Sequence, residues 1–285
     1  MKRSNVLLCC ALVGLLPTAC SSGGDPDPNG NRSDSTQVDL DHLTITVSGR
    51  AELRPEAARL LDAQGQRLPA LDGLTVTLEE PWGMGVNDEN AVLGEGLVGE
   101  DHAFAVSDVL VRNIHLSLAA RLEHPGLVRS ATVIFDTSLT RTRPSTDISD
   151  ARAWALPESF EQALTRSIGE AAIRGHSDQR AGTLRDAGFV LGRVVDASGA
   201  PLAGAVVVPE REELASRIYY PTPDFQGAPQ QGTSATGLFV YVHSGTAPES
   251  FLLSVKGRED YPQRNVAATP GSALVLTLSP GNDAR

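Results

Sequence analysis

The sequence predicts a mainly β protein with two antiparallel β-sandwich domains, joined by a linker that carries one amphipathic helix. Three observations lead to this prediction. Short segments alternate apolar and polar residues, these segments gather in two stretches of the chain, and clusters of turn-forming residues separate them. The chain has 285 residues, of which 41% are hydrophobic, so two domains of ordinary size can each bury a core.

The first β segment covers residues 38–137, with turn signals at 62–65 and 123–126. His115 alternates with apolar neighbours, so we expect its side chain on one face of a sheet. Regularly spaced short strands and turns are typical of an antiparallel sandwich. The strands expected here are 43–47, 74–78, 102–106, 114–118 and 131–135.

A polar linker is predicted over residues 138–187, and it contains one helix over 157–174. Pro157 suits the first helical turn, where its missing N–H costs nothing. Gly175 is a natural point for the helix to end. Glutamates in the first turn also complement the partial positive charge of the helix N-terminus.

Phe160, Leu164 and Ile168 recur at four-residue spacing and form an apolar stripe along this helix. Such a stripe needs a partner surface. Two interpretations are open: the helix is a connector that packs its stripe on a neighbouring domain, or it docks a separate partner protein.

The second β segment covers residues 188–280 and begins with a strand, a tight turn and a second strand over 192–208. The Asp196 side chain is expected to hold this turn by accepting backbone hydrogen bonds, while Gly199 supplies a positive φ. The further strands expected here are 237–242, 251–255 and 273–278.

The pattern G-x-V-x-D-x-x-G-x-P-L-x-G-A-x-V, followed by T-x-x-x-G-x-F, resembles the carboxypeptidase regulatory-like domain, a transthyretin-like sandwich related in architecture to Ig-like domains. The resemblance covers about a third of the chain. It departs from the family in a long insertion at 209–231 and in a final Gly-Tyr pair that is spread out as Gly257 and Tyr261. In that family the domain accompanies peptidases and transporters without catalysing, so the resemblance implies no catalytic residue. The residues that carry it are Gly192, Val194, Asp196, Gly199, Pro201, Leu202, Gly204, Ala205, Val207, Thr233, Gly237 and Phe239.

The first β segment looks like a diverged copy of the second. Residues 49–50, 62–70 and 73–78 parallel the start, turn and second strand of 192–208, with an insertion around Pro55. The alternative is that any two β-hairpins with glycine turns resemble one another.

The N-terminus resembles a bacterial lipoprotein signal. Lys2 and Arg3 precede an apolar run of about 11 residues, which is short of the roughly 20 that span a bilayer. Leu16-Pro17-Thr18-Ala19-Cys20 then resembles the lipobox, and this implies a signal peptide over 1–19 and lipid attachment at Cys20. The family usually has Leu where this chain has Pro17, so ordinary signal cleavage is the competing interpretation.

Residues 20–37 contain no apolar side chain after Cys20 and are expected to form a disordered tether. Ser21 follows the cysteine, and the sorting habit of such lipoproteins then favours the outer membrane. The predicted location is therefore the bacterial cell envelope, with the protein attached to a membrane through its N-terminal lipid. Whether the periplasmic or the outer surface displays it is left open.

Composition excludes several classes of function. A net charge of −11 disfavours a nucleic-acid partner, because phosphate binding needs a clustered basic face. The three cysteines are Cys9, Cys10 and Cys20, so the mature chain can form no internal disulfide or thiolate zinc site. The histidines are scattered singly, and the motifs G-x-S-x-G and H-E-x-x-H are absent. We therefore predict no catalytic residue, no metal and no cofactor.

A candidate binding loop is Tyr219 to Phe225, which concentrates the scarce aromatics Tyr219, Tyr220 and Phe225 between prolines. Prolines lower the entropy lost on ordering, and exposed aromatic rings are what binding surfaces use. Trp82 follows a strand of the first segment in a comparable way. The alternative for all four rings is that they cap the sandwich cores.

These observations predict a non-catalytic, membrane-anchored lipoprotein that presents β-sandwich modules for binding a protein or glycan of the cell envelope. A structural envelope spacer without a ligand is the first alternative. A hydrolase or metal-dependent enzyme with a spatially assembled site is the second.

Overall fold

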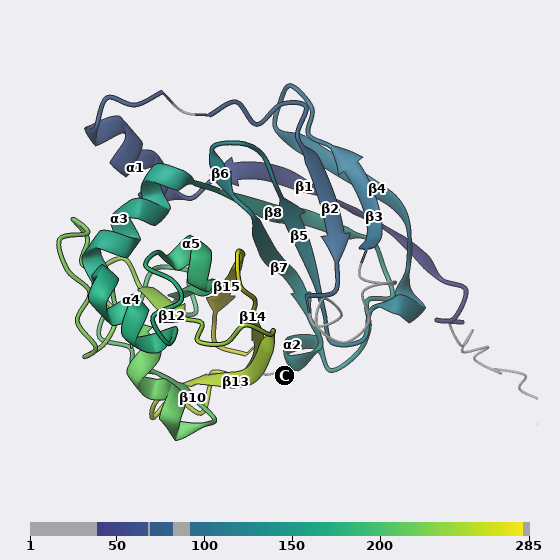
Figure 1. Ribbon diagram of the computed structural model, residues 1–285. Coiled ribbons are helices and arrows are strands. Elements are labelled where there is room, and N and C mark those ends of the chain that lie inside the picture. Colours follow the sequence, from purple (N-terminus) through teal and green to yellow (C-terminus); the bar gives the residue numbers. More distant parts are fainter. Residues whose placement is uncertain (1–38, 68, 82–91, 282–285) are drawn as a thin grey trace, which may run out of the picture. The chain divides into compact units, whose positions relative to one another are not determined.

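The computed structural model of the protein describes residues 39–67, 69–81 and 92–281 (Figure 1). All elements below belong to one unit, Val38–Arg285. The strands are β1 (Thr44–Leu53), β2 (Thr75–Glu79), β3 (Val92–Leu97), β4 (Ala103–Leu110), β5 (Ser117–Leu122), β6 (Leu127–Val128), β7 (Ser130–Asp136), β8 (Ile148–Pro157), β9 (Phe189–Val194), β10 (Val207–Pro209), β11 (Ile218–Tyr219), β12 (Leu238–Val242), β13 (Glu249–Val255), β14 (Arg264–Ala268) and β15 (Ala273–Leu278). The helices are α1 (Pro55–Ala63), α2 (Thr137–Thr140), α3 (Glu158–Ile168), α4 (Glu170–His176) and α5 (Leu184–Ala187), with 3₁₀ turns η3 (Val111–Asn113) and η4 (Glu212–Arg217).

The predicted mainly β fold is confirmed, and the strands of the described residues form three sheets. One has the order β4-β1-β8-β6 and another the order β10-β13-β14. The third runs β11-β12-β9-β15-β7-β5-β2-β3 and takes strands from both predicted β segments. Most neighbouring strands are antiparallel as expected, but β15 runs parallel to β7 and β9, and β1 runs parallel to β8.

Strand β15 joins the two segments, because it pairs with β9 on one side and with β7 on the other. Two ion pairs cross the same junction, one buried on both sides and one partly buried. Arg264 Nε of β14 lies 2.6 Å from Asp136 Oδ2 at the end of β7. Arg193 of β9 donates to Glu56 of α1. Continuous hydrogen bonding and these ion pairs together make this junction resistant to hinge motion.

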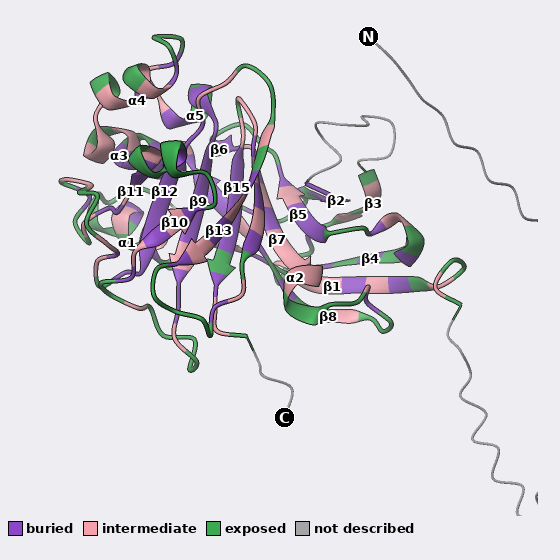
Figure 2. Cartoon of the chain, turned by 90° about the horizontal axis from the view of Figure 1, so that it is seen from below, coloured by how far each residue is buried: buried purple, intermediate pink, exposed green. Residues whose placement is uncertain are grey.

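The long sheet is buried on both faces where β12, β9 and β15 lie side by side (Figure 2). Leu238 and Val240 point to a core shared with α3 and α4, whereas Phe239 and Tyr241 point to a core shared with the β10-β13-β14 sheet. All five residues of β12 are consequently buried, although strict alternation would leave half of them exposed. A third core lies between the β4-β1-β8-β6 sheet and the strands β2 and β5.

The helix expected over 157–174 is present but interrupted. Gly169 has a φ of 94°, which an α-helix does not accommodate, so the chain forms α3 before it and α4 after it. Gly175 does not end the helix, since it lies within α4. Phe160 and Leu164 are fully buried against the long sheet, as the connector interpretation requires.

Strand β8 lies in the segment that the sequence analysis predicted as a polar linker. Its core-facing residues are Ala151, Ala153 and Ala155, and exposed or half-buried residues stand between them. Alanine has a weak strand preference and a small side chain, so this alternation gives little signal in the sequence.

His115 is not part of a strand, because β5 begins at Ser117 rather than at residue 114. The Glu80 carboxylate accepts hydrogen bonds from the backbone N–H groups of His115 and Leu116, at 3.0 and 2.6 Å. These donors are therefore unavailable to a sheet ladder. The turn expected at 62–65 does not connect two strands. Asp62 and Ala63 are instead the last residues of helix α1.

The turn after β9 is confirmed. Asp196 Oδ1 accepts from the N–H groups of Ser198 and Ala200, at 2.8 and 3.1 Å, and Gly199 has a φ of 81°. Gly192 is required by packing, since a Cβ there would lie 2.0 Å from the Phe239 ring. Gly192, Asp196 and Gly199 of the sequence motif therefore serve packing and turn formation.

Candidate functional site

A groove of about 250 Å³ runs beside β8, where this strand passes β7 and the end of β15. Its walls combine apolar side chains such as Ile134 and Ile148 with the hydroxyl of Thr277, the carboxylate of Asp150 and the guanidinium of Arg152. A mixed wall of this kind suits a ligand with both apolar and hydrogen-bonding surface. The lining residues are Thr132, Val133, Ile134, Ile148, Ser149, Asp150, Ala151, Arg152, Trp154, Leu276 and Thr277.

Trp154 is the one aromatic ring that lines this groove. Its backbone N–H donates to Thr132 Oγ1 at 2.9 Å, and its carbonyl accepts from Ser130 Oγ at 3.0 Å. The residue is half-buried and contributes to the groove wall. Its position is therefore fixed by strand β7, and a ligand would meet a preorganised surface.

Two guanidinium groups accompany the Trp154 ring. Arg54 Cζ lies 5.7 Å from the ring centroid and Arg152 Cζ lies 5.8 Å from it. Arg54 is only 2% exposed, and burial followed by the positive charge of Arg193 lowers its pKa to about 9. Glu56 accepts from Arg54 at 3.5 Å, so a carboxylate compensates the buried charge. Arg152 is exposed and pairs with an acidic side chain of β1.

Asp150 stands at a β-bulge in β8. Val47 pairs with Ile148 but Gly49 pairs with Ala151, so β8 has an additional residue there, and Asp150 adopts a φ of 58°. Its exposed carboxylate makes no hydrogen bond or ion pair with any described residue. Asp150 also lines a second groove of about 360 Å³, which shares Ser149 to Arg152 with the first.

The structure places the three aromatics of the candidate binding loop differently from one another. Tyr220 is 2% exposed, and its hydroxyl accepts from Val207 N at 2.8 Å. Phe225 is 8% exposed and packs edge-on against Phe160 with ring centroids 5.4 Å apart. These two rings are core residues, because the insertion folds back onto the sandwich. Tyr219 is half-buried and its hydroxyl lies 2.7 Å from His176 Nε2.

Trp82 and Cys20 lie outside the described residues. The candidate binding loop and the β8 groove share no residue, so the structure brings none of the predicted aromatics to the groove. Trp154 itself was not expected as a site residue. The signal that could have identified it is an aromatic residue in a strand of alternating alanines, flanked by charged side chains.

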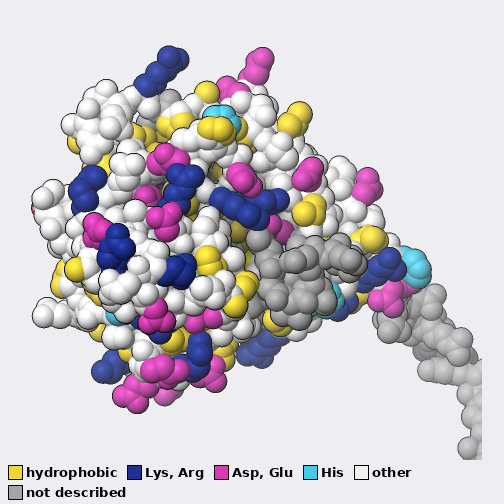
Figure 3. All heavy atoms as spheres, viewed as in Figure 1, with side chains coloured by type: hydrophobic (Ala, Val, Ile, Leu, Met, Phe, Trp, Pro, Cys, Tyr) yellow, Lys and Arg dark blue, Asp and Glu magenta, His cyan; other side chains and the backbone are white. Residues whose placement is uncertain are grey.

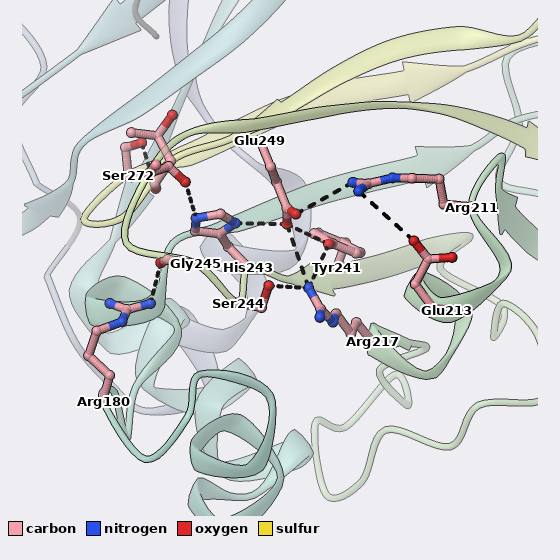
Figure 4. Close-up of polar contacts among 12 residues, drawn as sticks. Arg180, Arg211, Glu213, Arg217, Tyr241, His243, Ser244, Gly245, Glu249 and Ser272 are labelled. Carbon is pink, nitrogen blue, oxygen red and sulfur yellow. Dashed lines mark hydrogen bonds and ion pairs between the residues drawn. The ribbon is translucent and has the colours of Figure 1, made fainter.

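A second polar cluster surrounds Glu249 of β13 (Figure 4). Glu249 Oε1 lies 2.8 Å from His243 Nδ1 and accepts from the Tyr241 hydroxyl at 2.5 Å. Arg211 and Arg217 lie within 3.6 and 3.8 Å of the same carboxylate. His243 is fully buried, and its Nε2 lies 3.0 Å from Ala247 O. Both ring nitrogens are engaged, so neither can activate a nucleophile; the cluster fastens the 209–231 insertion to the sheet.

Burial alone raises the pKa of Glu249, but the hydrogen bonds from His243 and Tyr241 and the positive charge of Arg217 outweigh it and hold this pKa below its usual value. Burial, together with the hydrogen bond to Glu249, raises the pKa of Tyr241. A lowered folded-state pKa stabilises the protein above the usual glutamate pKa of 4.5, and this stabilisation disappears as the pH falls through the lowered value.

Glu249→Gln is therefore expected to lower the free energy of unfolding by about 1.5 to 3 kcal/mol at neutral pH, since it removes hydrogen bonds to a carboxylate. The difference from the wild type should shrink at a pH well below 4.5, where the wild-type carboxylate is protonated. Urea unfolding across this pH range measures the effect. A difference that stays constant with pH would contradict the assigned role of the charge.

A third cluster lies at the junction of the two segments. Glu79 is 2% exposed, burial raises its pKa, and its Oε2 lies 3.0 Å from Arg121 Nε. Its Oε1 has no hydrogen-bond partner among the described residues. The adjoining cavity measures about 20 Å³, which is room for about one water molecule. A cavity of this size is too small for an organic ligand.

Over the described ranges, no three His, Cys, Asp or Glu side chains gather closely enough to hold a metal ion. None of the described helices combines the length and apolar character needed to cross a membrane. Acidic and basic side chains are interspersed over the face of the molecule that Figure 3 shows. This face therefore does not present the clustered positive charge that nucleic acids require.

Comparisons with known proteins give no family. No family model matches the chain, and no curated protein matches it. Among solved structures, the chain is similar to the Bacillus anthracis TIE protein, at 9% identity over 84% of this chain and 35% of that one, with a TM-score of 0.22. It is also similar to a Streptococcal ancillary pilin, at 11% identity over 84% and 69% of the two chains, and to GBS52, the minor pilin of Streptococcus agalactiae, at 10% identity over 85% and 98%, both with TM-scores of 0.22. The chain thus spans about a third of the TIE protein. Likenesses at these TM-scores carry no conclusion about family or function.

Proposed function

We propose that the protein is a non-catalytic lipoprotein of the bacterial cell envelope, anchored through lipid on Cys20, whose β-sandwich module binds a glycan or protein of the envelope. The observation that carries the binding function is the groove beside β8, which is lined by the half-buried Trp154 and by the unpaired carboxylate of Asp150. Preformed grooves with an aromatic surface and a few fixed polar groups are the usual form of a ligand site.

The anchoring part rests on the sequence of the N-terminus. A charged start, a short apolar run and a cysteine after small residues agree with signal peptide 1–19 and tether 20–37. A tether without apolar residues would let the folded module stand away from the membrane surface. Membership of the second β segment in the carboxypeptidase regulatory-like family is part of the same proposal, as is its duplication.

One arrangement supports the duplication. Strand β1 lies between an antiparallel neighbour, β4, and a parallel one, β8. Strand β9 lies in the same way between antiparallel β12 and parallel β15. These two strands start the two proposed copies.

A structural spacer is the second candidate function, and the junction through β15 favours it. The parallel pairing of β15 with β7 and the buried Arg264–Asp136 pair hold the two segments in one arrangement. A spacer needs such rigidity but has no use for a groove lined by a tryptophan. Binding through the groove therefore distinguishes the two candidates.

The first experiment compares the wild type with Cys20→Ser after production in a bacterial host. We expect the wild type to carry the mass of a diacylglyceryl group and to fractionate with the membrane, while the variant is soluble. If both proteins are soluble and are cut near the same place, Pro17 has impaired the lipobox and the anchoring proposal fails.

The soluble Cys20→Ser protein then reports on the groove. It is mixed with washed envelopes of the same host, and the retained fraction is compared with that of Cys20→Ser proteins carrying Trp154→Ala or Asp150→Asn. We expect retention by the parent and its loss in both groove variants. Equal retention of all three proteins would remove the groove from the proposal and leave the spacer as the better candidate.

A further inference from the structure

We infer that the grooves beside β8 bind an uncharged oligosaccharide, with Trp154 against one sugar unit and with Arg152 and Asp150 as partners of hydroxyl groups further along the ligand. This inference rests on the proposed binding function and names the chemical class of its ligand. Four features of the groove support it.

The first feature is the combination of one aromatic ring with charged hydrogen-bonding groups. A pyranose ring has a face of C–H groups and an edge of hydroxyls. The negative face of an indole attracts the C–H groups. A carboxylate accepts hydrogen bonds from two adjacent hydroxyls, and the planar guanidinium donates to them. Trp154, Arg152 and Asp150 line one groove at alternate positions of β8, so they can provide these three groups to successive sugar units.

The second feature is that the carboxylate of Asp150 is free. It has no hydrogen bond or ion pair with any described residue, so a ligand gains its full acceptor capacity without breaking a contact of the protein. The bulge that gives Asp150 its φ of 58° also directs the chain out of the regular β8 register.

The third feature is size. The groove measures about 250 Å³ and extends along β8 from Ile148 to Trp154. The adjoining groove of about 360 Å³ shares Ser149 to Arg152 with it and is also lined by Arg50 and Phe104. A ligand that continues from one groove into the next, as an oligosaccharide does, can use both.

The fourth feature is that neither groove is lined by the exposed large apolar side chains that a protein-binding surface needs. The most exposed large apolar side chains are Val92, Leu97, Leu116 and Leu139, at 41 to 67% exposure, and none of them lines either groove. Protein interfaces concentrate such side chains at their centre. Arg50 and Arg152 both pair with Glu52, and the unpaired Asp150 supplies a second negative charge. The two positive and two negative charges balance, which favours an uncharged ligand.

The test uses short oligosaccharides of neutral hexoses and N-acetylhexosamines as probes, with calorimetric titration into the soluble Cys20→Ser protein. We expect at least one probe to bind and Asp150→Asn to weaken it by about tenfold or more, since a hydrogen bond to a charged group contributes that much. Trp154→Ala should abolish measurable binding. A melting curve of each variant shows whether it is folded. If Trp154→Ala does not fold, Asp150→Asn alone still tests the groove.

Asp108→Asn is the matched control, because Asp108 is also exposed and also has a φ of 58°, yet it lies on β4 and lines neither groove. It should bind the probes as the parent does. If no neutral oligosaccharide binds while the groove variants still abolish retention on envelopes, the carbohydrate inference is wrong and the proposed binding function stands. If a probe binds equally to the parent and to folded Asp150→Asn and Trp154→Ala, the groove is not its site.

Discussion

Replacing Asp136 with alanine is expected to lower the free energy of unfolding by about 3 to 5 kcal/mol. Asp136 is 3% exposed and its Oδ2 lies 2.6 Å from Arg264 Nε, which is 5% exposed. Removing the carboxylate leaves a buried guanidinium without its counter-charge. The same side chain accepts from Ser138 N at 2.7 Å at the start of α2, so a helix cap is lost as well. Urea unfolding of the two proteins measures the difference.

Two further variants separate these contributions. Asp136→Asn keeps a capping oxygen but removes the charge, so most of the loss should remain. The double variant Asp136→Leu with Arg264→Met removes both charges and should recover part of the stability, since an apolar pair of similar volume avoids the desolvation cost. Asp260→Ala breaks the exposed pair with Arg258 and should leave stability nearly unchanged. An Asp136→Asn protein as stable as the wild type would show that the buried charge pair contributes nothing.

Phe225→Ala is expected to have an effect of similar size, about 3 to 5 kcal/mol, because it empties a packed site in the core beneath α3. The ring is 8% exposed and meets Phe160 edge-on at 89°. Tyr220→Ala should cost a comparable amount, since that ring is 2% exposed and its hydroxyl bonds to the backbone of Val207. Thermal and urea unfolding both report the loss.

Tyr219→Phe is the control for this series. It removes only the hydroxyl that lies 2.7 Å from His176 Nε2, so we expect a loss of about 1 kcal/mol. If Phe225→Ala costs no more than Tyr219→Phe, the ring of Phe225 is not a core residue, and the loop from Tyr219 to Phe225 regains its standing as an exposed binding surface.

The sequence allowed most strands to be predicted, because alternation of apolar and polar residues follows directly from the two-residue period of a strand. Prediction from the sequence failed where small side chains or distant contacts, rather than alternation, determine the structure. The alternation of β8 is carried by alanines, which are small and weakly β-forming. At His115 the Glu80 carboxylate takes the backbone donors that a strand would use, and the sequence does not reveal that distant contact.

The candidate site was harder to predict than the fold. Aromatic residues near prolines suggested an exposed loop, yet the position of Tyr220 and Phe225 depends on how the insertion folds back, which no local pattern encodes. Trp154 was overlooked because it lies in a segment whose composition indicated a linker. Pairing of β15 with β7 could not be predicted either, since periodicity shows that a strand exists but not which strand lies beside it.

The place of β15 in the middle of the eight-stranded sheet also affects when the protein can fold. Strands β7 and β9 precede it in the chain, and neither has its full set of neighbours until residues 273–278 arrive. Pairings between distant segments form slowly, because the entropy of closing a long loop must be overcome first. Under the export that we propose, this delay would leave the polypeptide unfolded while it crosses the membrane. The same strand that makes the finished module rigid thus postpones that rigidity until nearly the whole chain is available to fold.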